Sequence, residues 1–225
     1  MPERPPPDGA PSDASIPEGP LSEGQFGAVL AAIDEVNAAD PNQLEVDGEV
    51  GPKELVHARL MTKWVLRLDP GADQAQLVAA RAHHLRRWAW PRSDYPEGRA
   101  GYLRWRAAAK RRHADEVGAI LADRGAPPAF VERVQGIVRK EGLAPGGREP
   151  CEPAVQVHED ALCLVFLETQ LDAVAARLGP AKATEVLRRT LAKMSPQGLA
   201  QARGLTLSEG GRGALGAAMG RDAGD

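Results

Sequence analysis

The sequence predicts an all-α fold, a compact array of several helices. Apolar residues recur at helical spacing in successive segments, as in the stripe formed by Phe26, Val29, Leu30, Ile33 and Val36. No segment shows sustained alternation of apolar and polar residues between hairpin turns. The chain also lacks an internal repeat and a heptad run long enough for a coiled coil. These three observations favour a globular helical domain.

Prolines, glycines and capping residues set the boundaries of the predicted helices. Asp40-Pro41 ends the first helix, because a residue before proline avoids the helical conformation, and residues 41–51 follow as a loop. Pro52 suits the start of the second helix, and Gly125 ends the fourth. The predicted helices are 22–40, 53–68, 73–88, 99–124, 128–140, 155–178, 181–194 and a short last helix that ends before residue 204.

The chain length and composition predict one folded domain with two tails. Residues 1–20 are rich in proline and have no apolar periodicity, so we expect a disordered N-terminal tail. Residues 21–203 form the single helical domain. Residues 204–225 are rich in glycine and alanine and are predicted to be a disordered C-terminal tail.

Several functional classes are disfavoured by the composition. No apolar run approaches the ~20 residues of a membrane span, and the N-terminus has no apolar signal-peptide centre, so we expect a cytoplasmic protein. The two cysteines, Cys151 and Cys163, are too few for a disulfide framework or a four-thiolate zinc site. Phosphate-loop, dinucleotide-binding and GxSxG motifs are absent.

A basic block lies within this acidic protein. Residues 81–112 contain ten Lys/Arg and two Asp/Glu, whereas the whole chain has a net charge of −3. Such a block is typical of a surface or pocket that binds an anion, although its arginines could equally pair with the chain's own acidic residues. Arginines there can bind phosphate, and aromatic rings can stack on a base or serve as core anchors. The predicted substrate-binding residues are Arg87, Arg92, Tyr95, Arg99, Tyr102 and Arg106.

Two histidines are predicted to face apolar neighbours. If residues 77–88 are helical, His84 shares a face with Leu77 and Trp88, and His113 lies in a row with Val117. A buried imidazole needs either hydrogen-bond partners or a metal ion, and both interpretations stay open.

Asp160 is predicted to point inward on the most apolar helix, on the same face as Leu164 and Leu167. A metal held by imidazoles and this carboxylate would lower the pKa of a bound water molecule. The alternative is that Asp160 caps a helix or pairs with an arginine of the basic block.

The constellation of His57, His83-His84, His113 and Asp160 resembles the HD superfamily of metal-dependent phosphohydrolases. The segment HADEVGAIL is similar to the helix that carries the third histidine of that family. The resemblance covers roughly residues 53–172 and implies an HD-domain-like fold with a bound metal. His84 stands where that family has its defining aspartate, and Lys140 stands where some members have another histidine.

A second resemblance covers residues 22–203. The segments KELVHARLMTKWVLRLDP, AARAHHLRRWAWPRSDYPEGRAGYLRWR, EDALCLVFLE and KMSPQG resemble a bacterial and fungal family known only as a domain of unknown function. His84, His113, Glu159 and Asp160 match its pattern, whereas the family usually has Tyr at position 57 and Gln at position 83. This resemblance implies a fold and a set of site residues, but no reaction.

The expected function is an HD-like, metal-dependent hydrolase that acts on a phosphorylated small molecule or a nucleotide. A divalent metal (Zn, Mn or Fe) is expected, with Glu159 and Lys140 as catalytic residues. A di-iron oxygenase is a variant of this prediction. The alternative is a non-catalytic nucleotide- or RNA-binding module that uses residues 81–112, and a protein-interaction role is a further possibility. The predicted metal ligands are His84, His113, Asp160, His83 and His57.

Overall fold

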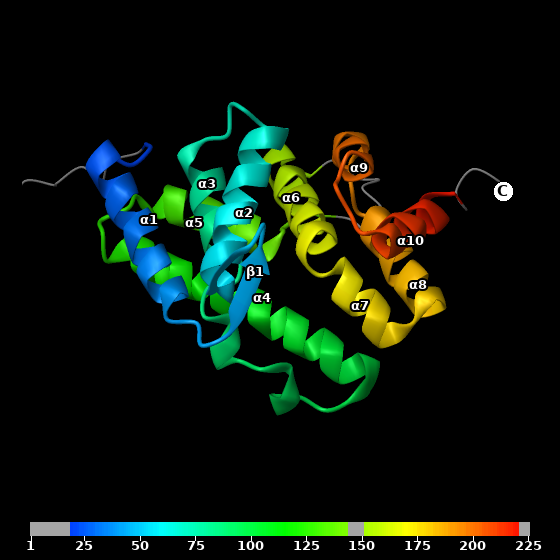
Figure 1. Cartoon of the computed structure of the whole chain (residues 1–225). Helices are drawn as coiled ribbons and strands as arrows, with labels where there is room; N and C mark the ends of the chain where they lie inside the picture. The colour runs from blue at the N-terminus through cyan, green and yellow to red at the C-terminus, as the bar shows by residue number, and fades with distance from the viewer. Residues whose placement is uncertain (1–18, 144–150, 221–225) are drawn as a thin grey trace, which may run out of the picture.

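The computed structural model describes residues 19–143 and 151–220, and these are mostly helical, as predicted (Figure 1). No helix in these ranges is both long enough and apolar enough to span a bilayer. The helices and strands are α1 (Glu23–Ala38), β1 (Gln43–Val46), β2 (Glu49–Pro52), α2 (Lys53–Leu68), α3 (Gln74–Ala82), α4 (Gly98–Ala122), α5 (Pro128–Arg139), α6 (Pro153–Thr169), α7 (Leu171–Leu178), α8 (Pro180–Leu191), α9 (Pro196–Arg203) and α10 (Glu209–Met219).

Two hydrophobic clusters build the core. The first joins α1, α3, α4 and α5 through fully buried side chains such as Val29, Val78 and Val117. The second joins α2, α6 and the C-terminal helices through residues such as Met61 and Leu164. In Figure 1 helix α1 therefore lies at one end of the molecule, the helices α8 to α10 lie at the other end, and α2 and α6 lie between them.

The predicted loop 41–51 contains a β-hairpin, so the expectation of a loop was wrong. Strands β1 and β2 pair antiparallel, with Val46 opposite Glu49. Asp47 and Gly48 both have positive φ angles (54° and 82°), as a tight two-residue hairpin turn requires. Each strand has only four residues, which is too short for a convincing alternation of apolar and polar side chains.

The third helix ends six residues earlier than predicted. Helix α3 stops at Ala82, His83 to Arg86 form a turn, and a 3₁₀ turn follows at Arg87–Ala89. The predicted helical face that would join Leu77 and His84 therefore does not form. Arg86 adopts a left-handed conformation (φ 51°), and the turn places Leu85 in the core with no exposed surface. Burial of Leu85 explains a break that no glycine or proline marks.

The C-terminal part of the chain also differs from prediction. The expected helix 155–178 is interrupted at Gln170 and forms α6 and α7. The expected C-terminal tail contains α10, which is capped by Ser208 and buries Leu215 and Ala218. Its contact face is mostly small residues, so its composition resembles that of a tail. Of the predicted tails, residues 1–18 and 221–225 lie outside the described ranges.

Candidate functional site

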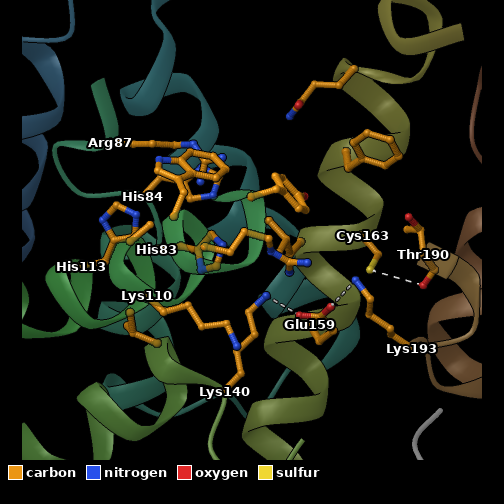
Figure 2. A pocket seen from close by; sticks show the side chains of 18 of the residues that line it. His83, His84, Arg87, Lys110, His113, Lys140, Glu159, Cys163, Thr190 and Lys193 are labelled. Carbon is orange, nitrogen blue, oxygen red and sulfur yellow. Dashed lines mark hydrogen bonds and ion pairs between the residues drawn. The ribbon is translucent and has the colours of Figure 1, made fainter. Parts of the chain in front are cut away.

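A cavity of about 260 Å³ opens between the two hydrophobic clusters (Figure 2). Its walls are the turn after α3, the helices α4, α6 and α8, and the end of α5. The histidines come from the turn after α3 and from α4, and the lysines come from α4, from the end of α5 and from the end of α8. The polar side chains that line it are His83, His84, Arg87, Tyr102, Trp105, Arg106, Lys110, His113, Lys140, Glu159, Gln170, Thr190 and Lys193.

All five histidines of the chain form one contiguous cluster of rings. The ring centroids of His57 and His84 are 4.2 Å apart, and those of His83 and His84 are 4.4 Å apart. His113 lies 5.9 Å from His84, and His158 lies 4.7 Å from His83. The rings come from α2, the turn after α3, α4 and α6, so tertiary packing assembles a cluster that is spread over 102 positions of the sequence.

Burial keeps these imidazoles neutral. It lowers the pKa of His57 and His158 to about 3 and that of His113 to about 4. Arg87 lies close enough to His57 to lower its pKa further by charge repulsion. At neutral pH each ring therefore has one nitrogen that carries a lone pair instead of a proton, the form that binds metals.

Several of the ring nitrogens have no hydrogen-bond partner among the described residues. His57 is 2% exposed, and both its nitrogens are without a partner. His113 Nδ1 lies 2.8 Å from the carbonyl of Leu85, so it carries the proton and leaves Nε2 as an unpartnered lone pair. A histidine that binds a metal through one nitrogen is typically oriented by a hydrogen bond from its other nitrogen to a backbone carbonyl, as here.

Glu54 supplies a carboxylate beside these rings. It is 4% exposed, and its Oε2 atom lies 3.1 Å from Nδ1 of His84. Burial raises its pKa to about 7, although Arg87 and Lys53 oppose this shift. Possible ligand atoms of Glu54, His57 and His84 lie within 4.8 Å of one another, as a metal site requires. We call Glu54, His57 and His84, together with His113, the histidine site.

The part of the cavity lining around Glu159 is cationic. Lys140 and Glu159 form an ion pair in which both side chains are nearly inaccessible, and Lys193 approaches the other oxygen of Glu159 at 3.5 Å. Burial by itself raises the pKa of Glu159, but the two ammonium groups reverse this and hold it below its ordinary value. Burial also lowers the pKa of Lys140, an effect that Glu159 opposes. Figure 2 shows both lysines pointing at this carboxylate.

Comparison with known proteins gives a family. A family model described as Domain of unknown function (DUF4202) matches residues 27–214. The chain belongs to the DUF4202 family. No curated protein and no solved structure matches it. These findings confirm the predicted membership of a family without an assigned reaction, and they give no support to the predicted HD resemblance.

The structure brings together most of the predicted metal ligands of this DUF4202 protein. His57, His84 and His113 belong to the histidine site, although His113 lies outside the group of converging ligand atoms. His83 is bound differently, since its Nδ1 lies 2.7 Å from Nε2 of His158.

Asp160 is buried as predicted, but its carboxylate has other partners. It accepts hydrogen bonds from the backbone and the hydroxyl of Ser195 and from the amide of Gln156. Ser195 is the N-cap of α9, so Asp160 anchors the start of that helix. Asp160 is therefore absent from the group of converging ligand atoms, and its contacts match the alternative interpretation, in which it caps a helix.

The predicted substrate-binding residues separate into two groups. Arg87, Tyr102 and Arg106 line the cavity, and the Arg87 guanidinium lies 4.6 Å from the centre of the Trp105 ring. The other group lies elsewhere.

Arg92, Tyr95 and Arg99 do not line the cavity. Arg92 donates hydrogen bonds to the carbonyls of Tyr95 and Pro96, both at 2.7 Å, and so organises its own loop. Arg99 is exposed on α4. The prediction treated all basic residues of the block alike, whereas the fold turns only some toward the cavity.

Sequence reasoning missed Glu54 and His158. Glu54 precedes His57 by three positions, which places both on one face of α2, and this spacing could have revealed it. His158 directly precedes Glu159 and was overlooked beside it. Lys110 and Lys193 carried no comparable pattern, because only the packing of α4 and α8 around α6 brings them to the cavity.

Proposed function

We propose that this protein is an HD-like, metal-dependent hydrolase that acts on a phosphorylated small molecule or a nucleotide. One observation supports this most: His57 and His113 have buried, neutral imidazole nitrogens without partners among the described residues, and His113 lines a cavity that also carries cationic side chains. Uncompensated polar atoms in a core are costly, so they indicate a ligand. The cationic wall favours an anionic substrate beside the metal.

Glu54, His57 and His84 would hold the ion, with His113 as a further ligand. Imidazole and carboxylate ligands suit Zn, Mn and Fe. Such an ion polarises a phosphoryl oxygen and lowers the pKa of a water molecule. Relative to the sequence prediction, Glu54 takes the place of Asp160 as the carboxylate ligand.

The residues of the cavity would bind and orient the substrate. His84 and His113 bring the histidine site to the cavity surface, where Arg87 and Arg106 can bind the phosphoryl group. Tyr102 forms part of the same wall, 6.0 Å from the ring of Trp105, and offers a face for a planar group. A volume of about 260 Å³ suits a small molecule or a mononucleotide rather than a polymer.

Glu159 is better suited to positioning an anionic ligand, through the lysines that it binds, than to abstracting a proton. Two ammonium groups stabilise its ionised form and lower its pKa, which weakens it as a general base. Its pairing with Lys140 holds that lysine in the cavity wall. We therefore assign Glu159 and Lys140 to the positioning of an anionic ligand.

Metal content tests the proposal directly. Untagged protein is purified without chelator, incubated with Zn, Mn or Fe, and analysed by mass spectrometry. Wild type should hold near-stoichiometric metal, whereas His84→Ala, His57→Ala and Glu54→Gln should lose it while keeping their helicity. His158→Gln is the matched control, because His158 is equally buried but lies outside the group whose ligand atoms converge.

Phosphate release from a panel of phosphate monoesters and nucleotides then tests the reaction. Activity should depend on added metal and disappear in His84→Ala. Wild type that stays free of all three metals contradicts the proposal, and so does metal that is retained in every ligand variant.

The second candidate is a non-catalytic nucleotide- or RNA-binding module. The outer face of α4 favours it, because Arg99, Arg104 and Arg111 are exposed there. Phosphate contacts would make the affinity for RNA fall steeply with salt. Arg104→Ala and Arg111→Ala should then abolish RNA binding and leave metal content unchanged, whereas His84→Ala should leave RNA binding intact.

A further inference from the structure

Three lysines line the cavity around one carboxylate (Figure 2). Lys140 comes from the end of α5, Lys193 follows α8, and Lys110 lies on α4. Glu159 of α6 pairs with Lys140 and Lys193. We call these three lysines with Glu159 the lysine site.

The ammonium groups have more donors than their partners use. Lys140 is 7% exposed, and its ammonium has three N–H donors. The described residues offer it one hydrogen-bond acceptor, Glu159. Lys110 has one long hydrogen bond, 3.5 Å to the carbonyl of Arg139. Unused charged donors beside a cavity indicate an anionic ligand, because buried charges are normally paired.

The charge of the cavity is also unbalanced. Among the described residues, five cationic side chains line it, and Glu159 is the single acidic side chain on the same lining. The neutral histidines add no charge, and burial together with Lys140 lowers the pKa of Lys110, a sign of repulsion between neighbouring cations. Arg87 and Arg106 lie on the side of the histidine site, so they suffice for one phosphoryl group there. The excess positive charge of the lysine site is left for a second anionic group.

We infer that the lysine site is a second anion subsite, which binds an acidic group at the far end of the substrate. The substrate class is therefore a phosphate monoester that carries another carboxylate or phosphate. This inference rests on the proposed function for the end that carries the reacting phosphoryl group. Glu159 keeps the lysines together and reduces their mutual repulsion before the ligand binds.

Three probes differ only at the far end: glycerol 3-phosphate has a hydroxyl group there, 3-phosphoglycerate a carboxylate, and glycerol 1,3-bisphosphate a phosphate. Their dissociation constants are measured by titration calorimetry at low salt with zinc-loaded and chelator-treated protein. Wild type should bind at least one doubly acidic probe about tenfold or more tightly than glycerol 3-phosphate, as charged hydrogen bonds imply. The stronger of the two identifies the second group as carboxylate or phosphate.

Lys193→Met tests the subsite without creating a cavity in the hydrophobic core, because the Lys193 side chain is one-third exposed. It should remove the preference, whereas Lys182→Met, which removes a charge from an exposed position of α8, should retain it. Equal affinity of wild type for all three probes, or binding of none at about 10 mM, overturns the inference. A preference that survives in Lys193→Met overturns it as well.

The preference for a doubly acidic probe should not depend on the metal. His84→Ala and chelator-treated wild type should keep the preference for a doubly acidic probe, even though the phosphoryl end binds more weakly. If wild type binds no metal but shows the preference, the lysine site stands and the proposed hydrolase fails. If wild type binds metal and shows no preference, the hydrolase stands and the lysine site fails.

Discussion

Replacing His57 should stabilise the metal-free protein while removing its response to metal. His57 is 2% exposed, and both of its ring nitrogens are without partners among the described residues. A buried polar group without a partner costs about 1–3 kcal/mol. Leucine removes both nitrogens at similar volume, but it loses the ring contact with His84, worth about 0.5–1.5 kcal/mol. We therefore expect His57→Leu to raise the free energy of unfolding by about 2 kcal/mol.

Urea denaturation in the presence of chelator measures this difference, and thermal unfolding should show a rise of about 6 °C. In zinc the order should reverse, because metal at 100 times its dissociation constant adds about 2.7 kcal/mol to wild type. The variant should show no such increase.

His158→Leu is the matched control, since His158 is 1% exposed but bonds to His83. The Nδ1 atom of His158 also has no partner among the described residues, so the gain from removing it is offset by the loss of the bond to His83. His158→Leu should therefore be stabilised less than His57→Leu in chelator. A loss of more than about 1 kcal/mol in His57→Leu would refute the reasoning. It would show that the nitrogens of His57 are satisfied in solution without a metal.

Three further predictions concern pH and two structural contacts. Neutral buried histidines stabilise the fold above pH 6.5, so acidification toward pH 4 should lower the free energy of unfolding, by about 3 kcal/mol for His113 alone, whose pKa falls to about 4. Glu54 acts in the opposite sense, because its pKa is raised to about 7 and its stabilisation is lost as pH rises. Glu54→Gln should therefore make the free energy of unfolding fall more steeply on acidification between pH 6.5 and 4.5, as measured by urea titrations. An unchanged dependence of this free energy on pH would contradict the prediction. A Cβ atom on Gly198 would lie 2.6 Å from Cγ of Asp160, so Gly198→Ala should cost about 1–3 kcal/mol in the same assay, and a neutral effect would show that the α9 cap shifts freely. Arg92→Ala should increase hydrogen exchange in the loop 91–98, because Arg92 binds the carbonyls of Tyr95 and Pro96 there, and it should not change the metal content. A loss of metal would place Arg92 in the site after all.

The helices of the core could be predicted because each carries its own periodic pattern. The stripe of α1 and the boundaries of α2, α4 and α5 depend on local spacing, prolines and glycines, which are visible in the sequence. The elements that were missed are those whose stability comes from contacts elsewhere. The end of α3 at Ala82 depends on the burial of Leu85, and α10 depends on the small residues that pack on its neighbours.

The residue types of the candidate site were also readable from the sequence. The sequence prediction assigned His57, His83, His84 and His113, the acidic residue Glu159 and the basic block to one shared site. Their roles were not readable, because Asp160 and Glu159 are adjacent on α6 and face different partners. One caps α9, and the other pairs with two lysines.

By itself, the sequence determined the helical class and the chemical types of the site residues, which follow from local periodicity and composition. It also determined the family, which follows from the match of long segments to the family model. Tertiary structure alone decided which side chains meet. It placed Glu54 beside His57 and His84, left the ring nitrogens of His57 without partners, and brought Lys110 and Lys193 to the cavity. The physical reason is that packing between segments distant in the chain decides how deeply each group is buried and which hydrogen-bond partners it has. Burial and partners in turn set the charge state of the group and its unused donors and acceptors.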